Sequence, residues 1–483
     1  MKKNNKKFPS SGTGSDNILS AIKKRKSKDI KWDSGKMFGF VYHPGDEISQ
    51  FIEQVYNLYF YENALNPSLF PSIREFENEI VSMTASLLNA GDDFAGNITS
   101  GGTESIFLAI KTARDISRQN KPHIKNPEII VPVTAHPAFN KAAHYLGIKV
   151  IPVLAGEDKR VDLDALKNAI SSSTILIACS APTFPHGVVD PVDKIAQLAL
   201  EHNIFCHVDA CLGGFMLPFI EKMDFPVPLY DFRIPGVTSI SADAHKYGYA
   251  PKGVSIIIYR DSKIRKQQFF VHTDWPGGIF GTPCFQGTRS AASVVSFWAL
   301  VHLLGMKGYL ELAGKTMEAA KFIMKNINRI PGLKIISNPE MSVFAFTSDH
   351  NDIYLIADEM ASRGWHLDRQ QFPESLHMTI THSNTVQAEP FIKDLLKSVN
   401  KVRKSGFHKV SSSIKVSSAQ ILSRILPSET FRKITRSGAS GIHTSGKNKP
   451  SKSAVIYGIA ASFENRKDVR LMILDLLDQM YRL

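Results

Sequence analysis

The sequence predicts an α/β protein with a large, mostly parallel sheet domain and a smaller α+β domain toward the C-terminus. Three observations carry this prediction. Short apolar strands alternate with helical segments from about residue 90 to 300, a pattern typical of a doubly wound parallel sheet. Beyond about residue 310 the alternation gives way to a mixture of helix and strand. The chain of 483 residues is also too long for a single ordinary core.

Each expected element follows from its apolar pattern. In the large domain, short apolar runs predict strands over 128–133, 149–153, 174–180, 204–209, 239–242 and 254–259. Apolar residues spaced three and four apart predict helices over 75–88, 104–119, 137–146, 163–169 and 191–202. The same patterns predict strands over 334–337, 343–347 and 377–381 and helices over 353–363 and 467–481 in the small domain.

These elements divide the chain into four parts. We expect a flexible basic arm over 1–30, a helical segment over 31–90, a large domain over 91–308 and a small α+β domain over 309–483. A basic tract at 401–453, rich in Ser and Gly, interrupts the small domain as a flexible insertion.

The composition is that of a soluble globular protein, with 43% apolar and 21% charged residues. No apolar run approaches the roughly 20 residues that span a bilayer. The basic N-terminus is not followed by an apolar segment, which argues against a secretory signal, so we expect a soluble cytoplasmic protein. The four cysteines show no ligand spacing, which predicts buried thiols and no metal site.

The formal charge of +13 is concentrated in two tracts. One is the N-terminal arm, and the other is 401–453, which has twelve Lys and Arg residues against the single acid Glu429. This distribution argues against a nucleic-acid partner. Two interpretations stay open for the basic tracts: solvated tails, or peripheral contact with anionic lipid headgroups or another polyanion.

Two residues at strand ends carry the chemistry. Asp209 ends one apolar strand, and Lys246 follows the next one. A buried carboxylate is costly without a partner, and a carboxylate that keeps a pyridine nitrogen protonated is what pyridoxal 5′-phosphate requires. Lys246 would then be the Schiff-base lysine, and we expect its amine to have a lowered pKa. Together the two motifs predict a pyridoxal phosphate enzyme.

Other residues match the remaining needs of that cofactor. The segment 99–105 places two glycines at a helix start, where free N–H groups and hydroxyls bind a phosphate, although an ordinary helix cap would explain it alone. His136 follows a strand and is a candidate to stack on the ring, or is a structural histidine. His245 lies beside Lys246 and is placed to help hold the phosphate.

The chain resembles the sphingosine-1-phosphate lyases, in the group II decarboxylase branch of the fold-type I pyridoxal phosphate enzymes. The resemblance covers about 35–395 and resumes near 454. The segments that carry it are 99–105, 135–143, 184–190, 207–214, 231–253, 268–275 and Tyr457-Gly458. The continuation Tyr247–Gly253 and the block 268–275 separate it from the amino-acid decarboxylases.

The resemblance implies a homodimer with shared active sites and assigns roles by position. Catalytic residues would be Lys246 and Tyr42, either of which moves the reacting protons. The cofactor would be held by Lys246, Asp209, His136, Ser100, Gly102, Thr103 and His245, with Gly287 and Thr288 reaching it from the neighbouring subunit. The substrate would meet Lys252, Tyr42, Asn63 and Asn66. Ala64 and Asn66 stand where the family usually has Pro and His, so a possible positive charge is missing.

The implied reaction is retro-aldol cleavage of a phosphorylated sphingoid base, sphingosine 1-phosphate, to a long-chain aldehyde and phosphoethanolamine. Such an enzyme is an aldehyde-lyase of sphingolipid metabolism. Two other functions are weighed beside it. An amino-acid decarboxylase would release carbon dioxide, and a catalytically silent lipid-binding scaffold would hold no cofactor.

Overall fold

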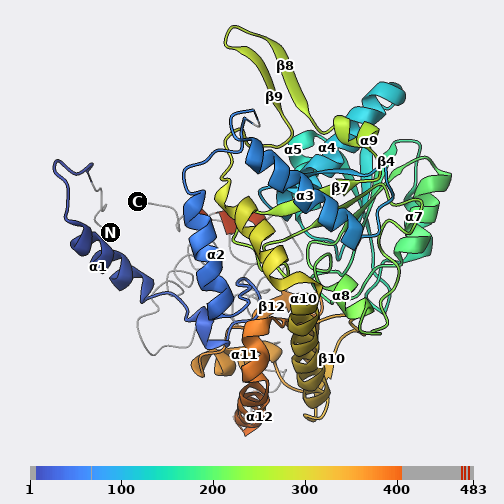
Figure 1. Ribbon diagram of the computed structural model, residues 1–483. Coiled ribbons are helices and arrows are strands. Elements are labelled where there is room, and N and C mark those ends of the chain that lie inside the picture. The colour runs from blue at the N-terminus through green and yellow to red at the C-terminus, as the bar shows by residue number, and fades with distance from the viewer. Residues whose placement is uncertain (1–6, 67, 405–468, 472, 475–476, 479–483) are drawn as a thin grey trace. The chain divides into compact units, whose positions relative to one another are not determined.

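The computed structural model describes residues 7–66, 68–404, 469–471, 473–474 and 477–478 (Figure 1). The chain divides into two compact units. The larger contains Phe38–Phe346 and His377–Ala388, and the smaller contains Met1–Met37, Thr347–Leu376 and Glu389–Leu483. Expectations for the tract 401–453 beyond Lys404, for Tyr457-Gly458 and for most of a helix over 467–481 concern residues outside those described.

A seven-stranded sheet forms the centre of the larger unit, in the order β1-β7-β6-β5-β4-β2-β3. Five neighbouring strands run parallel, whereas β7 pairs antiparallel with both β1 and β6. This confirms the mostly parallel sheet. The strands are β1 (Ala95–Thr99), β2 (Glu128–Pro132), β3 (Lys149–Val153), β4 (Thr174–Ser180), β5 (Phe205–Asp209), β6 (Ser239–Ala242) and β7 (Ser255–Tyr259).

Helices cover both faces of this sheet (Figure 1). On one face, α4 (Gly102–Asn120) and α5 (Ala138–Leu146) pack on Ile129 and Val131 of β2. On the other face, Ile130 joins a core formed with α3, α7 and α8. The alternation follows from the two-residue period of a strand. These further helices are α3 (Pro71–Leu87), α6 (Leu163–Ala169), α7 (Val192–Glu201), α8 (Leu217–Glu221) and α9 (Ser262–Lys266).

Two more helices complete the larger unit, α2 (Asp46–Leu58) and the long α10 (Ala292–Ile327). Gly305 interrupts α10 with a positive φ of 53°, a conformation that glycine adopts without strain. By length and composition α10 is able to cross a membrane, but 44% of its most apolar window is buried inside the protein. Its buried residues Val294, Phe297 and Leu300 pack in the core of the larger unit.

A two-stranded ribbon projects from the larger unit (Figure 1). It consists of β8 (Phe270–Trp275) paired antiparallel with β9 (Gly278–Thr282), and every residue of β8 is exposed. The apolar pattern of the sequence did not predict β1, β8 or β9, because β1 carries Gly96 and Asn97 and the ribbon buries neither face.

The smaller unit contains α1 (Ser15–Lys26), a short 3₁₀ helix (Trp32–Ser34), α11 (Ile353–Ser362), β12 (Asp368–Gln371) and most of α12 (Ala388–Lys404). A four-stranded sheet has the order β10-β11-β13-β12. Its other strands are β10 (Leu333–Ile335), β11 (Val343–Ser348) and β13 (Glu374–Thr379), and the unit boundary cuts β11 and β13.

The compact units differ from the predicted domains in two ways. Residues 7–26 include helix α1, although the sequence predicted a flexible arm; a basic last turn complements the helix dipole there. The predicted boundary near 308 falls inside α10, so the start of the small α+β part belongs to the larger unit. The kink at Gly305 lies close to the predicted boundary, but the helical parts on both sides of it belong to the larger unit.

Candidate active site

Lys246 lies in a tight loop that follows β6. The loop closes through hydrogen bonds from the Lys246 N–H to the Asp243 carbonyl (3.1 Å) and from the Ala250 N–H to the Ala244 carbonyl (3.0 Å). A Cβ at Gly248 would lie 2.5 Å from the Ala244 oxygen, so only glycine fits there. The loop thereby fixes the direction in which the Lys246 side chain leaves the sheet.

The Lys246 amine forms an ion pair with a neighbour that the sequence analysis had not assigned. Its Nζ lies 3.1 Å from Oδ2 of Asp243. Burial alone would lower the pKa of Lys246, but the Asp243 carboxylate, followed by Cys211 and Asp209, raises the pKa above its ordinary value. The expectation of a lowered pKa is therefore wrong for this free amine, because the loop supplies its own counter-ion.

Asp209 ends β5, as predicted, and is buried. Its Oδ1 accepts a hydrogen bond from the Cys211 N–H at 3.1 Å. Since side chains alternate along a strand, Asp209 shares the face of His207, whose ring contacts Phe139 of α5. Asp209 therefore lies on the face that α4 covers, where the candidate phosphate site also lies.

His207 supports this end of the sheet from a fully buried position. Its Nδ1 lies 2.8 Å from the hydroxyl of Ser239, and its Nε2 lies 3.3 Å from the hydroxyl of Ser241. The thiol of Cys211 donates to the same Ser241 hydroxyl. Burial lowers the pKa of His207 to about 4, so the imidazole is neutral at physiological pH.

The N-terminus of α4 forms the candidate phosphate cradle. Gly101 precedes the helix in an extended conformation, and Gly102 is the first helical residue. A Cβ on Gly102 would lie 2.6 Å from the Cys211 sulfur and 2.8 Å from Asp243 Oδ2. The first N–H groups of a helix have no intrahelical acceptor, so this close-packed glycine turn presents donors to an anion. Ser100 is half-buried in the same turn, and Thr103 is exposed.

His245, Lys252 and Tyr42 lie around the Lys246 loop. His245 Nδ1 lies 2.7 Å from the Val254 carbonyl, and Lys252 Nζ donates to the His245 carbonyl at 3.1 Å. The Lys252 Nζ also lies over the Tyr42 ring, 5.3 Å from its centroid. Tyr42 packs edge-on against Tyr247. The structure thus brings two of the four predicted substrate residues, Tyr42 and Lys252, to the lysine loop.

Protonation in this group follows from burial and charge. Burial, followed by the like charge of Lys246, lowers the pKa of Lys252. Burial also lowers the pKa of His245. For Tyr42, burial followed by the Asp243 charge raises the pKa, so its phenol stays protonated. The phenol is therefore a proton donor, and Lys252 is a cation that loses its proton more readily than an ordinary lysine.

Three predicted site residues, His136, Asn66 and Thr103, make no contact with the group around Lys246 through a hydrogen bond or ion pair among the described residues. His136 is exposed, and its Nδ1 accepts the N–H of Ala138. Asn66 is exposed, and its side chain accepts the N–H of Ser68 within a turn. Among the described residues, no hydrogen bond or ion pair connects His136, Asn66 or Thr103 with Lys246 or Asp209.

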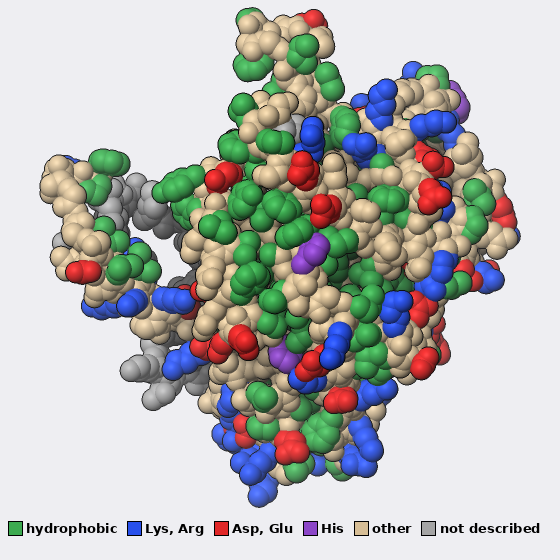
Figure 2. Space-filling view, viewed as in Figure 1, with side chains coloured by type: hydrophobic (Ala, Val, Ile, Leu, Met, Phe, Trp, Pro, Cys, Tyr) green, Lys and Arg blue, Asp and Glu red, His purple; other side chains and the backbone are tan. Residues whose placement is uncertain are grey.

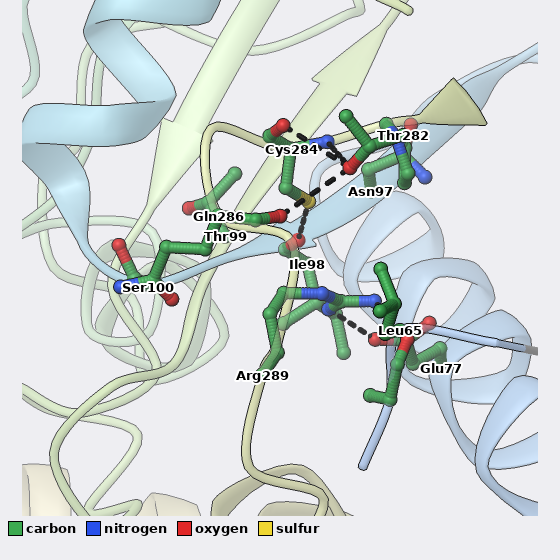
Figure 3. Close-up of polar contacts among 12 residues, drawn as sticks. Leu65, Glu77, Asn97, Ile98, Thr99, Ser100, Thr282, Cys284, Gln286 and Arg289 are labelled. Atoms are coloured by element: carbon green, nitrogen blue, oxygen red, sulfur yellow. Dashed lines mark hydrogen bonds and ion pairs between the residues drawn. The ribbon is translucent and has the colours of Figure 1, made fainter. Parts of the chain in front are cut away.

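Asn63 and Thr288 form a second group. The Asn63 amide donates to the Thr288 hydroxyl at 3.4 Å and accepts the Arg289 N–H. Arg289 pairs with Glu77 of α3 (Figure 3). The loop that contains Gly287 and Thr288 therefore packs on residue 63 of its own chain, with Thr288 exposed.

The same loop approaches the phosphate cradle along β1. Cys284 Sγ donates to the Ile98 carbonyl at 3.0 Å, beside Thr99 and Ser100 (Figure 3). Buried Glu104 links the two segments, because it accepts the N–H groups of both Ser100 and Phe285. Sequence reasoning missed Glu104 and Asp243. The sequence did offer a signal for both: Glu104 is an acid inside the glycine-rich segment 99–105, and Asp243 is an acid directly after the apolar strand 239–242.

The comparisons with known proteins agree with this geometry. The family model described as the pyridoxal-dependent decarboxylase conserved domain matches residues 1–348. The chain is 43% identical to sphingosine-1-phosphate lyase 1 of Rattus norvegicus over 403 residues, covering 83% of this chain and 71% of the rat protein. This chain belongs to the pyridoxal-dependent decarboxylase family, among its sphingosine-1-phosphate lyases. The predicted resemblance is thereby confirmed.

Two further relatives support the assignment. Sphingosine-1-phosphate lyase of Dictyostelium discoideum is 44% identical over 82% of this chain and 74% of its own length. The solved structure of the Burkholderia pseudomallei sphingosine-1-phosphate lyase superposes with a TM-score of 0.80 at 36% identity, covering 87% of this chain and 98% of that one. Both the fold-type I fold and the cofactor class of this family member follow.

The residues present fit pyridoxal phosphate. At the start of α4, Gly102 has space for nothing larger than hydrogen, and the free N–H groups of a helix N-terminus suit a phosphate. Asp209 ends β5 with one oxygen committed to the Cys211 N–H, and Lys246 projects from the next strand's loop. The carboxyl ends of parallel strands are the usual ligand site of such sheets.

Proposed function

We propose that this protein cleaves sphingosine 1-phosphate to a long-chain aldehyde and phosphoethanolamine. The observation that carries the proposal is the 43% identity to the rat lyase over 403 residues. It favours carbon–carbon cleavage over amino-acid decarboxylation, because the relatives of highest identity named above are lyases. The grouping of Lys246, Asp209, Tyr42 and Lys252 supports an active enzyme over a silent scaffold.

When bound, pyridoxal phosphate supplies an electron sink that accepts the pair released from the broken carbon–carbon bond. Asp209 holds a proton on the ring nitrogen. Gly102, Ser100 and His245 hold the phosphate, with Thr103 at the exposed side of the same turn. Tyr42, whose phenol stays protonated, and Lys246 are the groups that donate or accept protons at the reacting centre.

The substrate phosphate needs a cationic partner. Lys252 is the candidate, since it lies within the Lys246 loop and over the ring of Tyr42. Asn63 and His136 remain proposed ligands of substrate and cofactor, because they lie on segments that border the site. Asn66 offers only an amide at the position where the family pattern expects a histidine.

The experiment that tests this function is incubation of the purified protein with sphingosine 1-phosphate and mass spectrometry of the products. We expect aldehyde and phosphoethanolamine from the wild type and loss of both in Lys246→Ala. If Lys246→Ala turns over sphingosine 1-phosphate at the wild-type rate, Lys246 takes no part in the reaction.

We also propose a homodimer with shared active sites. Support comes from apolar side chains on the β8–β9 ribbon and the loop after it, which project from the unit (Figure 2). Ile279 is 81% exposed, and Trp275 and Phe285 are also exposed. A monomer rarely leaves so many large apolar groups uncovered together. Gly287 and Thr288 follow this ribbon, so a second copy covering it would gain access to them.

Finally, we propose a soluble, cytoplasmic protein that contacts anionic membrane surfaces peripherally. Helix α1 supports the contact. Its apolar residues Ile18, Leu19 and Ile22 are exposed. Its last turn is basic throughout, with Lys23, Lys24, Arg25 and Lys26. A basic helix with exposed apolar residues suits a lipid interface. No nucleic-acid partner is proposed.

A further inference from the structure

Asp243 is a buried carboxylate to which the proposed reaction gives no role. It is 2% exposed. Its Oδ2 lies 3.1 Å from Lys246 Nζ and 3.7 Å from His245 Nε2. Its Oδ1 is buried and has no hydrogen-bond partner among the described residues. An unpaired buried charge is strongly destabilising. Burial raises the pKa of Asp243, but Lys246, then His245 and a hydrogen bond with Ser255, lower it below its ordinary value and so permit a carboxylate here.

The same carboxylate lies against the first turn of α4. A Cβ added to Gly102 would lie 2.8 Å and 2.9 Å from its two oxygens. The N-terminus of a helix stabilises a negative charge through its free N–H groups and its dipole. Asp243 therefore connects the lysine loop with the helix that forms the phosphate cradle.

Other ionisable groups face Lys246 at longer range. Asp209 and Cys211 approach from the end of β5, and His245 and Lys252 belong to the lysine loop itself. Tyr42 lies beyond Lys252. Among the described residues, Asp243 makes the direct ion pair with Lys246, so the position of the amine depends chiefly on this carboxylate.

We propose that Asp243 is a positioning residue that pins the Lys246 amine beside helix α4 and keeps it protonated until a carbonyl group reaches it. When that happens, one proton passes from Nζ to a water molecule, which leaves the amine neutral, and the Asp243 carboxylate keeps all its bonds. The inference rests on the cofactor of the family and does not depend on which substrate the enzyme cleaves.

The test is a pH profile of Lys246 acetylation in the full chain, cleared of cofactor with hydroxylamine. Acetic anhydride reacts only with the neutral amine, and peptide mass spectrometry compares Lys246 with exposed lysines of the same sample. We expect wild-type Lys246 to become reactive at higher pH than the exposed lysines. In Asp243→Asn the pH at which Lys246 becomes reactive should fall by at least one unit. At a fixed pH below the wild-type midpoint, Lys246 of the variant should therefore be labelled about tenfold faster.

Two further variants separate this role from general destabilisation. Asp231→Asn also removes a buried carboxylate, but one that pairs with Arg233, so it should leave the Lys246 profile unchanged. Gly102→Ala places a methyl group on the Asp243 carboxylate and should move the profile in the same direction as Asp243→Asn.

An unchanged profile in Asp243→Asn would overturn the proposal. If that variant does not fold, the wild-type profile decides: Lys246 titrating together with or below the exposed lysines contradicts the ion pair. The assay uses no sphingosine 1-phosphate, so its outcome is independent of the proposed reaction.

Discussion

At the residue scale, the buried histidines make the fold sensitive to acid. Burial lowers the pKa of His186 and of His207 to about 4, and both ring nitrogens of His186 lack partners among the described residues. A group with a lowered pKa binds its proton more weakly in the folded state than in the unfolded state. Stability is therefore lost as the pH falls from about 6.5 toward 4.

For each histidine, we expect the free energy of unfolding to fall by about 2 kcal/mol when the pH is lowered from 7 to 5. Burial raises the pKa of Asp190 to about 6, which works in the opposite direction and offsets about 1 kcal/mol. Urea unfolding at the two pH values measures the net loss, and His186→Gln should reduce it. Equal stability at pH 7 and pH 5 would contradict the assigned burial of these imidazoles.

Single residues were predictable from the sequence where the residue type and its place at a strand end together indicate a chemical role. Lys246 and Asp209 follow apolar strands, and the sheet places both at its carboxyl edge. Asp243 was not predictable as the partner of Lys246, because the distance between the two side chains depends on the tight turn. The contact between Lys252 and Tyr42 joins residues far apart in the chain, and only the resemblance pointed to it.

At the scale of elements, the β8–β9 ribbon is where the dimer proposal is tested. Light scattering with size-exclusion chromatography should give twice the chain mass of 53.6 kDa for the wild type. Ile279→Asp places a charge on the exposed apolar ribbon and should shift the protein toward the monomer, with loss of activity. Leu200→Asp, at an exposed position of α7, is the matched control and should stay dimeric. A wild type of single-chain mass would refute the proposal.

Helix α1 is the second element with a testable role. Replacing Lys23, Lys24, Arg25 and Lys26 by Gln should abolish co-sedimentation with vesicles that contain phosphatidylserine, because the charge attraction is lost. Added salt should weaken wild-type binding in the same way. Vesicles of phosphatidylcholine alone are the control. Equal binding by the variant would contradict the proposed membrane contact of α1.

Elements with strong periodicity were predicted closely. The predicted strands over 149–153, 174–180 and 239–242 match β3, β4 and β6 residue for residue. Weakly patterned elements were missed, for physical reasons. β1 contains Gly96, whose Cβ would lie 2.6 Å from the Ile257 carbonyl of β7, so its place is set by close packing of backbones. Helix α1 buries no residue, so no apolar face identified it.

At the scale of the whole molecule, the family assignment connects fold and site. The order of motifs along the chain was sufficient to predict the cofactor and the parallel sheet, because strand ends converge at one edge of such a sheet. The division into compact units was not predictable, since the larger unit continues through both parts of α10, on either side of the kink at Gly305, as far as Phe346.

The most direct measurement of the central claim is the product balance from sphingosine 1-phosphate. With pyridoxal phosphate present, the wild type should release long-chain aldehyde and phosphoethanolamine in equal amounts, with no carbon dioxide from amino acids tested in parallel. Lys246→Ala should lose at least a thousandfold in rate. Carbon dioxide release without aldehyde, or aldehyde at an unchanged rate in Lys246→Ala, would contradict the account.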